Sequence, residues 1–120
     1  MQKVTETEKV EDCPIRQVIV GIAGKWQILI LTELSNGALR FGVLKRKIGD
    51  ISQRVLTEKL RSLERDGHLT RSVSPGPPVA VSYELTTRGH QLVERLVPLI
   101  EWAAIHHAEI ERSRSSFDAR

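Results

Sequence analysis

The middle of the chain has the apolar and polar pattern of an amphipathic helix. Four apolar residues between positions 53 and 66 fall on one helix face: Val55, Leu56, Leu60 and Leu63. The opposite face is polar and mostly charged: Arg54, Thr57, Glu58, Arg61 and Arg65. Ser52 is a suitable N-cap for this helix, and Gly67 is a suitable C-terminal stop. We therefore predict a helix that buries one face and presents the other to solvent.

The segments on either side predict a supporting helix and a hairpin. Residues 41–48 have helical apolar spacing, and a Gly-Asp turn leads from them into the amphipathic helix. Residues 68–74 predict a strand, 75–78 a Pro/Gly-rich tip, and 81–86 the return strand. Two helices joined by a short turn and followed by a hairpin are typical of a winged helix-turn-helix. The predicted fold class is mainly α with a small β-hairpin wing (α+β).

Apolar stripes near both ends of the chain indicate a surface for a second copy. A first helix is predicted to open at Pro14, an apolar core helix to cover 25–35, and a long last helix to cover 87–113 with a kink at Pro98. The last helix carries more apolar surface than one small core needs, so we expect a homodimer through the first and last helices. The expected interface residues are Ile15, Ile19, Leu92, Leu96, Leu99, Trp102 and Ala103. Alternatively, the last helix packs wholly within its own domain.

Length and composition suggest one folded domain with two polar ends. The 120 residues suit a single domain. We expect a mobile N-terminal arm at 1–12, a winged helix-turn-helix domain with its dimerisation helix at 13–112, and a frayed tail at 113–120. The chain has no apolar run of about 18 residues, so we predict no membrane span. The polar, acidic start of the chain does not resemble a signal peptide. We therefore expect a cytoplasmic protein with no membrane partner.

The positive charge is concentrated around the predicted helix-turn-helix. The net charge of the chain is only +3, which does not identify a nucleic-acid partner by itself. Residues 25–72, however, contain ten basic and five acidic residues. Gln and Arg at the start of an exposed helix can pair bidentately with base edges in the major groove. Double-stranded DNA is therefore the expected partner.

Other chemistry has little support in the sequence. The single cysteine excludes an internal disulfide and a Cys-based zinc site. His106 and His107 are adjacent, so on a helix they point in different directions and make a poor metal pair. No nucleophile motif, metalloprotease motif or phosphate-binding glycine loop is found. We expect neither an enzyme nor a bound cofactor or metal.

A series of short motifs follows a fixed order between Cys13 and Ala104. They are Cys13-Pro14, Gly24-Lys25-Trp26, Leu39-Arg40-Phe41, Ile51-Ser52-Gln53-Arg54-Val55-Leu56-Thr57, Leu60-Arg61 with Leu63-Glu64 and Gly67, Val81-Ser82-Tyr83 with Leu85-Thr86, and Gly89. Each motif is weak alone, but the ordered set is specific. It resembles the HxlR-type bacterial transcriptional regulators, which are relatives of the MarR-type winged-helix proteins. The resemblance implies a winged-helix homodimer that binds an inverted-repeat operator and inserts the helix after Ser52 into the major groove.

The expected DNA-contacting residues lie mainly on that helix. Gln53, Arg54 and Thr57 are expected at base edges, and Arg61 on the DNA backbone. The full set of expected DNA-binding residues is Lys25, Arg40, Ser52, Gln53, Arg54, Thr57, Arg61 and Arg71. Within it, Lys25, Arg40 and Arg71 are the phosphate candidates.

The hairpin departs from the family pattern. The family often has a basic residue just before its Val-x-Tyr motif, where this chain has Ala80. Beyond Arg71 the hairpin contains no Lys or Arg. We therefore expect less DNA contact from its tip. The alternative function is a winged-helix module for protein–protein contact, favoured by this bare tip and by an acidic last helix.

Cys13 is a candidate redox sensor. The resemblance implies that a cysteine at this place can respond to oxidants or electrophiles. The N-terminus of a helix and Arg16 one turn away favour the reactive thiolate, whereas Glu11 and Asp12 oppose it. The alternative is a small residue that packs at the dimer interface. A small-molecule or oxidant effector is therefore an open expectation, with an intermolecular Cys13–Cys13 link or an adduct as the chemical outcome.

Overall fold

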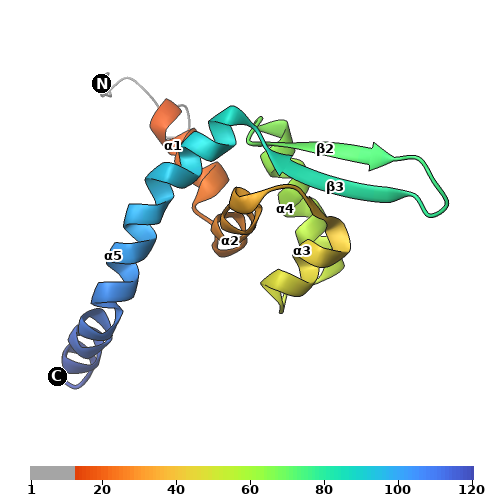
Figure 1. Ribbon diagram of the computed structural model, residues 1–120. Helices are drawn as coiled ribbons and strands as arrows, with labels where there is room; N and C mark the ends of the chain where they lie inside the picture. Colours follow the sequence, from red (N-terminus) through yellow and green to blue (C-terminus); the bar gives the residue numbers. More distant parts are fainter. Residues whose placement is uncertain (1–12) are drawn as a thin grey trace.

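The computed structural model describes residues 13–120 and has the helix-turn-helix and hairpin in the expected order (Figure 1). The elements are α1 (Pro14–Ile22), α2 (Lys25–Glu33), the 3₁₀ turn η2 (Leu34–Asn36), β1 (Leu39–Arg40), α3 (Phe41–Ile48), α4 (Gln53–Arg65), β2 (Leu69–Ser74), β3 (Ala80–Leu85) and α5 (Thr87–Asp118). The fold is mainly helical with one small sheet, so the predicted fold class is confirmed. The N-terminal arm predicted at 1–12 lies outside the described residues.

The core lies between the helices and one end of the sheet. Eight large apolar side chains are fully buried: Ile30, Leu31, Leu34, Leu44, Leu56, Leu60, Leu63 and Leu69. Helix α2 packs against α1, α3, α4 and α5, so its predicted central place in the core is confirmed (Figure 1). Burying such side chains stabilises the fold by about 1.5–3 kcal/mol each relative to exposure. This core therefore fixes the positions of α3 and α4, the helix-turn-helix pair.

The sheet joins the hairpin to the helix-turn-helix. Its strands are antiparallel in the order β1-β3-β2. In the hairpin, Leu69 pairs with Leu85 at the base and Ser74 with Ala80 near the tip. The two-residue strand β1 places Arg40 opposite Ser82. Because β1 leads directly into α3, the wing is held at a fixed position relative to both helices.

Local signals set the ends of α4. The Ser52 hydroxyl accepts a hydrogen bond from the Val55 N–H at 3.1 Å, as an N-cap should. Gly67 follows the C-cap residue Asp66 and has φ of 78°, a left-handed conformation that glycine adopts without strain. Both predicted helix boundaries are therefore confirmed.

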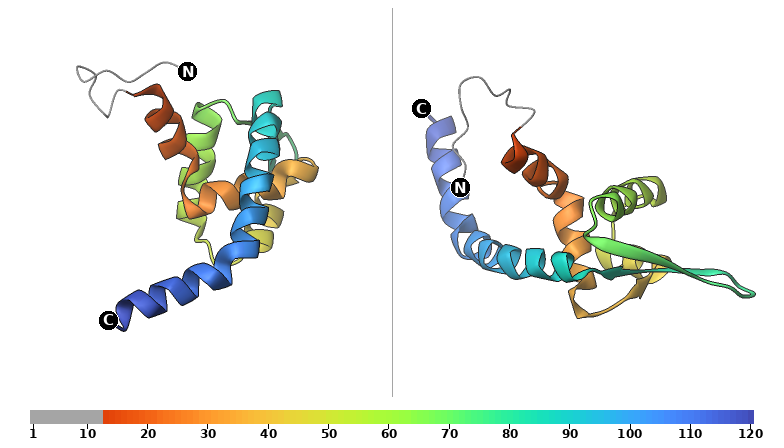
Figure 2. Two further views of the ribbon diagram at one scale, coloured as in Figure 1. Left: turned by 90° about the vertical axis from the view of Figure 1, so that its left-hand side faces the viewer. Right: turned by 90° about the horizontal axis from the view of Figure 1, so that it is seen from above.

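Helix α5 is longer than the sequence suggested. It continues to Asp118, so the prediction of a frayed tail from residue 113 is wrong. Helical backbone hydrogen bonds need no apolar stripe, so an exposed helix end can continue without one. An ion pair between Arg114 and Glu111 at 3.0 Å adds support one helical turn apart. Figure 2 shows that α5 bends about midway along its length, and the helix contains Pro98, which lacks the N–H that the helical pattern requires.

In the described part of the chain, no single helix is long and apolar enough to cross a membrane. Helix α1 and the segment made of α2 and η2 are long and apolar enough for a span only when taken together, and they are bent by 72° relative to each other.

Candidate nucleic-acid interface

Helix α4 presents a polar surface because its apolar side faces the core. Leu56, Leu60 and Leu63 are fully buried, which fixes the rotation of the helix about its axis. The opposite side is solvent-exposed and carries Arg54, Thr57 and Arg61, and Gln53 is exposed at the start of the helix. A helix with this exposed face has the size and chemistry that the major groove of DNA admits.

Two hydroxyl groups of α4 are already engaged within the helix. The side chain of Ser52 caps the N-terminus through Val55, and the Thr57 hydroxyl donates to the Gln53 carbonyl oxygen at 2.8 Å. The main role of Ser52 is therefore structural: its hydroxyl caps α4. Thr57 still offers oxygen lone pairs and a methyl group to a ligand. The longer side chains of Gln53 and Arg54 have no such internal hydrogen bond among the described residues.

A cavity lies between the start of α4, the start of α3 and the wing. Its volume is about 490 Å³. It is lined by Arg40, Phe41, Gly42, Gln53, Thr57, Arg71, Pro78, Val79, Ala80, Val81 and Tyr83. The fold thus brings together Arg40 from β1, Arg71 from β2 and the first turns of α4, although these segments are well separated in sequence. Two guanidinium groups at the margin of a concave surface suit an anionic partner such as a phosphate backbone.

Four of the expected DNA-binding residues lie outside this cavity, one of them the capping residue Ser52. Arg54 and Arg61 are exposed further around α4. Lys25 starts α2, and its Nζ lies 4.3 Å from the centroid of the Trp26 ring. That cation–π contact occupies Lys25 within its own helix.

The cavity also contains residues that the sequence analysis did not select. Phe41, Tyr83 and Val79 line it together with the expected polar residues. Phe41 and Tyr83 belong to two of the sequence motifs, which was the available signal. Val79, at the wing tip, carried none, because its place in this cavity depends on the assembled fold.

The expected dimer-interface residues fall into two groups. Ile15, Ile19, Leu99 and Trp102 have about half their surface exposed, at 48%, 52%, 57% and 52%, and Ala103 is also exposed. Leu96 is only 8% exposed and belongs to the domain core, against which Leu92 also packs. Leu96 therefore offers little surface to a partner, and the half-buried Leu92 offers less than the exposed group does. Leu92 and Leu96 precede Pro98 by six and two residues, in the half of α5 that lies against the domain.

Cys13 is buried at the N-cap position of α1. Its carbonyl oxygen accepts a hydrogen bond from the Gln17 N–H at 3.0 Å. The thiol makes no side-chain capping hydrogen bond. The residue thus occupies the helix N-terminus as predicted, but with little exposed surface.

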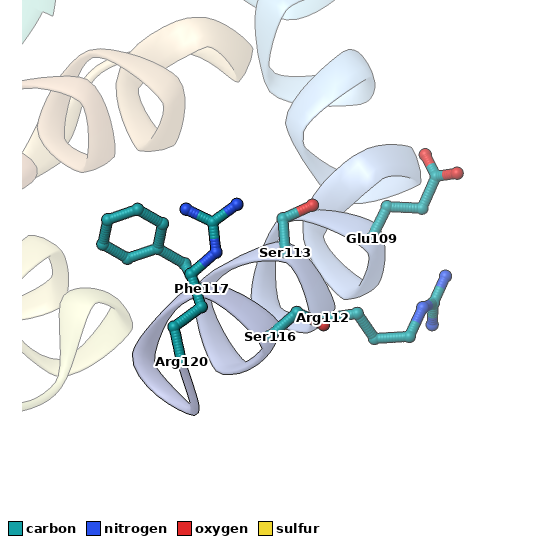
Figure 3. Close-up of a pocket in the computed structure, with 6 residues that line it drawn as sticks. All are labelled: Glu109, Arg112, Ser113, Ser116, Phe117 and Arg120. Atoms are coloured by element: carbon teal, nitrogen blue, oxygen red, sulfur yellow. The ribbon is translucent and has the colours of Figure 1, made fainter.

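A further hollow of about 530 Å³ lies on the last turns of α5 (Figure 3). Its lining residues come from the last turns of α5 and from Arg120, which follows the helix: Glu109, Arg112, Ser113, Ser116, Phe117 and Arg120. The Arg120 guanidinium stacks on the exposed Phe117 ring, 5.2 Å from its centroid. A surface lined by a single helix end lacks opposing walls, so we assign the candidate site to the α4–wing cavity instead.

Comparison with known proteins agrees with this geometry. The sequence model of a family described as HxlR-like helix-turn-helix matches residues 21–111. The chain is 39% identical over 100 residues to the uncharacterized HTH-type transcriptional regulator YtfH of Escherichia coli (strain K12), covering 83% of this chain and 79% of that protein. An HTH-type transcriptional regulator of Methanothermobacter thermautotrophicus is also 39% identical, over 84% of this chain and 77% of its own length.

Solved structures give the same result. The structure of ytfH from Salmonella typhimurium matches with a TM-score of 0.81 and 35% identity, covering 88% of this chain and 95% of that one. The oxidized form of the redox regulator HypR matches with a TM-score of 0.71 and 35% identity, covering 77% and 95% of the two chains.

Proposed function

The chain belongs to the HxlR-like helix-turn-helix family of transcriptional regulators, and on this premise we propose that it binds double-stranded DNA sequence-specifically with α4 in the major groove. The carrying observation is the exposed polar face of α4 beside the cavity that Arg40 and Arg71 border. In this arrangement the side chains on α4 read base edges and the flanking guanidinium groups neutralise phosphates. The proposal includes action in the cytoplasm, where the DNA is.

Arg54 tests the base-reading part of the proposal. Its guanidinium is exposed at the start of α4 and can pair bidentately with a guanine. We expect Arg54→Ala to weaken binding to the operator by about 1–3 kcal/mol and to relax specificity at one base pair. The operator is first selected from fragmented genomic DNA, and binding is then followed by fluorescence anisotropy. Arg65→Ala, at the exposed far end of α4, is the matched control. Equal operator affinity for Arg54→Ala and wild type would remove Arg54 from the interface.

Arg40 tests the phosphate-contacting part. Its loss should lower affinity for specific and nonspecific DNA alike and reduce the salt slope by about 1. Measurements at two or more salt concentrations separate this result from a change in base readout. An unchanged salt slope would place Arg40 away from the phosphates.

We also propose a homodimer through α1 and α5. Their exposed apolar residues suit burial against a second copy, and they include Ile15, Ile19, Leu99, Trp102 and Ala103. A two-fold dimer presents two α4 helices related by symmetry, which fits an inverted-repeat operator.

We also propose that Cys13 senses oxidants or electrophiles. Support comes from its place at a helix N-terminus next to the proposed dimer surface, and from the likeness to the redox regulator HypR. Since the chain has one cysteine, the outcome of oxidation is a disulfide between protomers or an adduct. Cys13→Ser should bind the operator normally and lose oxidant-dependent release. Equal release from wild type and variant would exclude Cys13 as the sensor.

A protein–protein module is the second candidate function. The exposed apolar side chains of Val73 and Val79 on the wing favour it. Titration with fragmented genomic DNA at two salt concentrations distinguishes the candidates. A DNA reader retains a subset of tightly bound fragments at the higher salt, whereas a protein-binding module loses all of them together.

A further inference from the structure

The exposed surface of α4 has an uncharged row of side chains beside the wing. Gln53 and Thr57 line the cavity between α4 and the wing, whereas Arg54 and Arg61 lie outside it. Because Gln53 and Thr57 are four residues apart, they are neighbours on one face of the helix. Neutral side chains lack the charge attraction to phosphates that arginine has. This row therefore offers DNA contacts with the edges of bases.

The hydroxyl group of Thr57 is engaged within its own helix. It donates to the Gln53 carbonyl oxygen at 2.8 Å, a normal length for a hydrogen bond between a hydroxyl and a carbonyl. A threonine hydroxyl has a single hydrogen, so this bond uses the one donor of the side chain. The bond also holds the hydroxyl towards the helix backbone, and the methyl group takes another position on Cβ. Since Thr57 is exposed, it presents its methyl group and oxygen lone pairs to a partner.

The wing adds apolar groups to the same cavity. Pro78, Val79 and Ala80 line it together with Thr57. Their side chains carry no hydrogen-bonding atom, so they favour an apolar group of a partner over a polar one. Val79 is 65% exposed, which leaves much of its surface open to such a contact. These apolar neighbours make the Thr57 methyl group, rather than its oxygen, the part of the side chain best suited to recognition.

We propose that Thr57 selects a thymine in each half of the operator by packing its methyl group against the C5 methyl group of that base. This inference rests on the proposed binding of α4 in the major groove. Among the standard DNA bases, thymine is the one that has a methyl group at the major-groove edge. Arg40 and Arg71, which border the same cavity, serve the phosphates, so the cavity combines apolar base recognition with backbone contacts.

Replacement of thymine by deoxyuridine tests the contact, because it removes the C5 methyl group and leaves base pairing and phosphates unchanged. The operator is selected from fragmented genomic DNA, and each thymine of a half-site is then replaced in turn, on both strands. Binding of the full chain is followed by fluorescence anisotropy. We expect one position at which the wild type loses affinity by about threefold or more, as the loss of one buried methyl group predicts.

Two variants assign this loss to Thr57. Thr57→Ser keeps the hydroxyl and lacks the methyl group. It should therefore bind the unmodified operator about as weakly as wild type binds the deoxyuridine operator, and lose nothing more on deoxyuridine at that position. Thr57→Val keeps the methyl group and lacks the hydroxyl, so it should retain the wild-type sensitivity to deoxyuridine. Thr70→Ser, an exposed position near the base of the hairpin, is the matched control and should behave as wild type does.

The contrary results separate this inference from the proposed function. An operator that is bound equally well with deoxyuridine at every thymine would overturn the thymine contact and leave DNA binding by α4 in place. A Thr57→Ser variant with full wild-type sensitivity would show that another side chain contacts the methyl group. A Thr57→Val variant without sensitivity would show that the hydroxyl is the recognising group, and either result overturns the inference. Failure to select any fragment, before a base is modified, would instead reject the proposed function itself.

Discussion

Gly89 is the residue at which the packing between α5 and the hairpin is tightest. It is buried in the first turn of α5, and a Cβ atom there would collide with the carbonyl oxygen of His68. That oxygen cannot move freely, because it accepts the Thr86 N–H. We expect Gly89→Ala to lower the free energy of unfolding by about 1–3 kcal/mol, measured by urea denaturation.

The control for this substitution is Gly42→Ala on α3. Gly42 is exposed, and its added Cβ would meet nothing closer than the Arg46 Nη1 at 3.6 Å. Alanine favours a helix over glycine, so this variant should be as stable as wild type or slightly more stable. Equal stability of the two variants would show that the α5–hairpin contact can relax.

His68 should make the stability of the protein depend on pH. Burial lowers the pKa of His68 below its usual value of about 6.5, Arg88 adds to this effect, and Asp66 opposes it. As the pH falls through about 6.5, the unfolded chain takes up a proton that the folded chain accepts only at lower pH. The free energy of unfolding should therefore decrease in this window. Urea denaturation at several pH values should show a smaller decrease for His68→Gln, and an identical pH profile would contradict the assigned role.

At the scale of elements, the wing brings little charge to the proposed DNA interface, since Arg71 is the one Lys or Arg among residues 69–85. Its tip lies beside the cavity that contains Arg40 and Arg71, and Val79 is exposed there. If the tip faces DNA, Val79→Lys should add one phosphate contact. Affinity should then rise at low salt, and the salt slope should steepen by about 1. Thr70→Lys, near the base of the hairpin, is the control. An unchanged slope for Val79→Lys would place the tip away from the phosphates.

The elements that sequence predicted well are those set by local signals. The Ser52 cap, the stop at Gly67 and the apolar spacing of residues 41–48 act within one or two turns, and the structure has helices with these bounds. The hairpin was predicted within one residue at each strand end for the same reason. The end of α5 was missed because an exposed helix can continue without an apolar stripe.

Features that depend on distant contacts could not be predicted. The cavity beside α4 requires β1 to pair with β3, which places Arg40 near the wing. The burial of Leu96 depends on which half of α5 lies against the domain, and its spacing alone did not separate it from Leu99. Within residues 13–120, the ring Nδ1 of His68 is buried without a hydrogen-bond partner, and this burial likewise depends on the assembled fold. Sequence patterns identify faces of elements, whereas their partners follow from the assembled fold.

At the scale of the whole molecule, the protomer is extended. Its radius of gyration is 17.7 Å, whereas a compact domain of this length has about 13.6 Å. Much of the difference comes from α5, whose second half projects away from the other elements (Figure 2). The projecting part carries exposed Leu99, Trp102 and Ile105. A long helix with such side chains is stabilised when a second copy covers it, which is the physical basis for the proposed dimer.

Leu99→Lys should separate dimerisation from folding. The position is exposed in the protomer, so the charge should leave the unfolding free energy nearly unchanged, while in an apolar interface it should weaken the dimer by about 2 kcal/mol or more. Analytical ultracentrifugation measures the dimer dissociation constant, and Val73→Lys, an exposed apolar position on the wing, is the matched control.

Where the dimer is lost, affinity for an inverted repeat should fall towards that for a single half-site, because the two α4 helices are no longer linked. A Leu99→Lys variant that remains dimeric would move the interface away from this part of α5. A monomer that still prefers the full inverted repeat over a half-site would reject the link between dimer symmetry and operator symmetry.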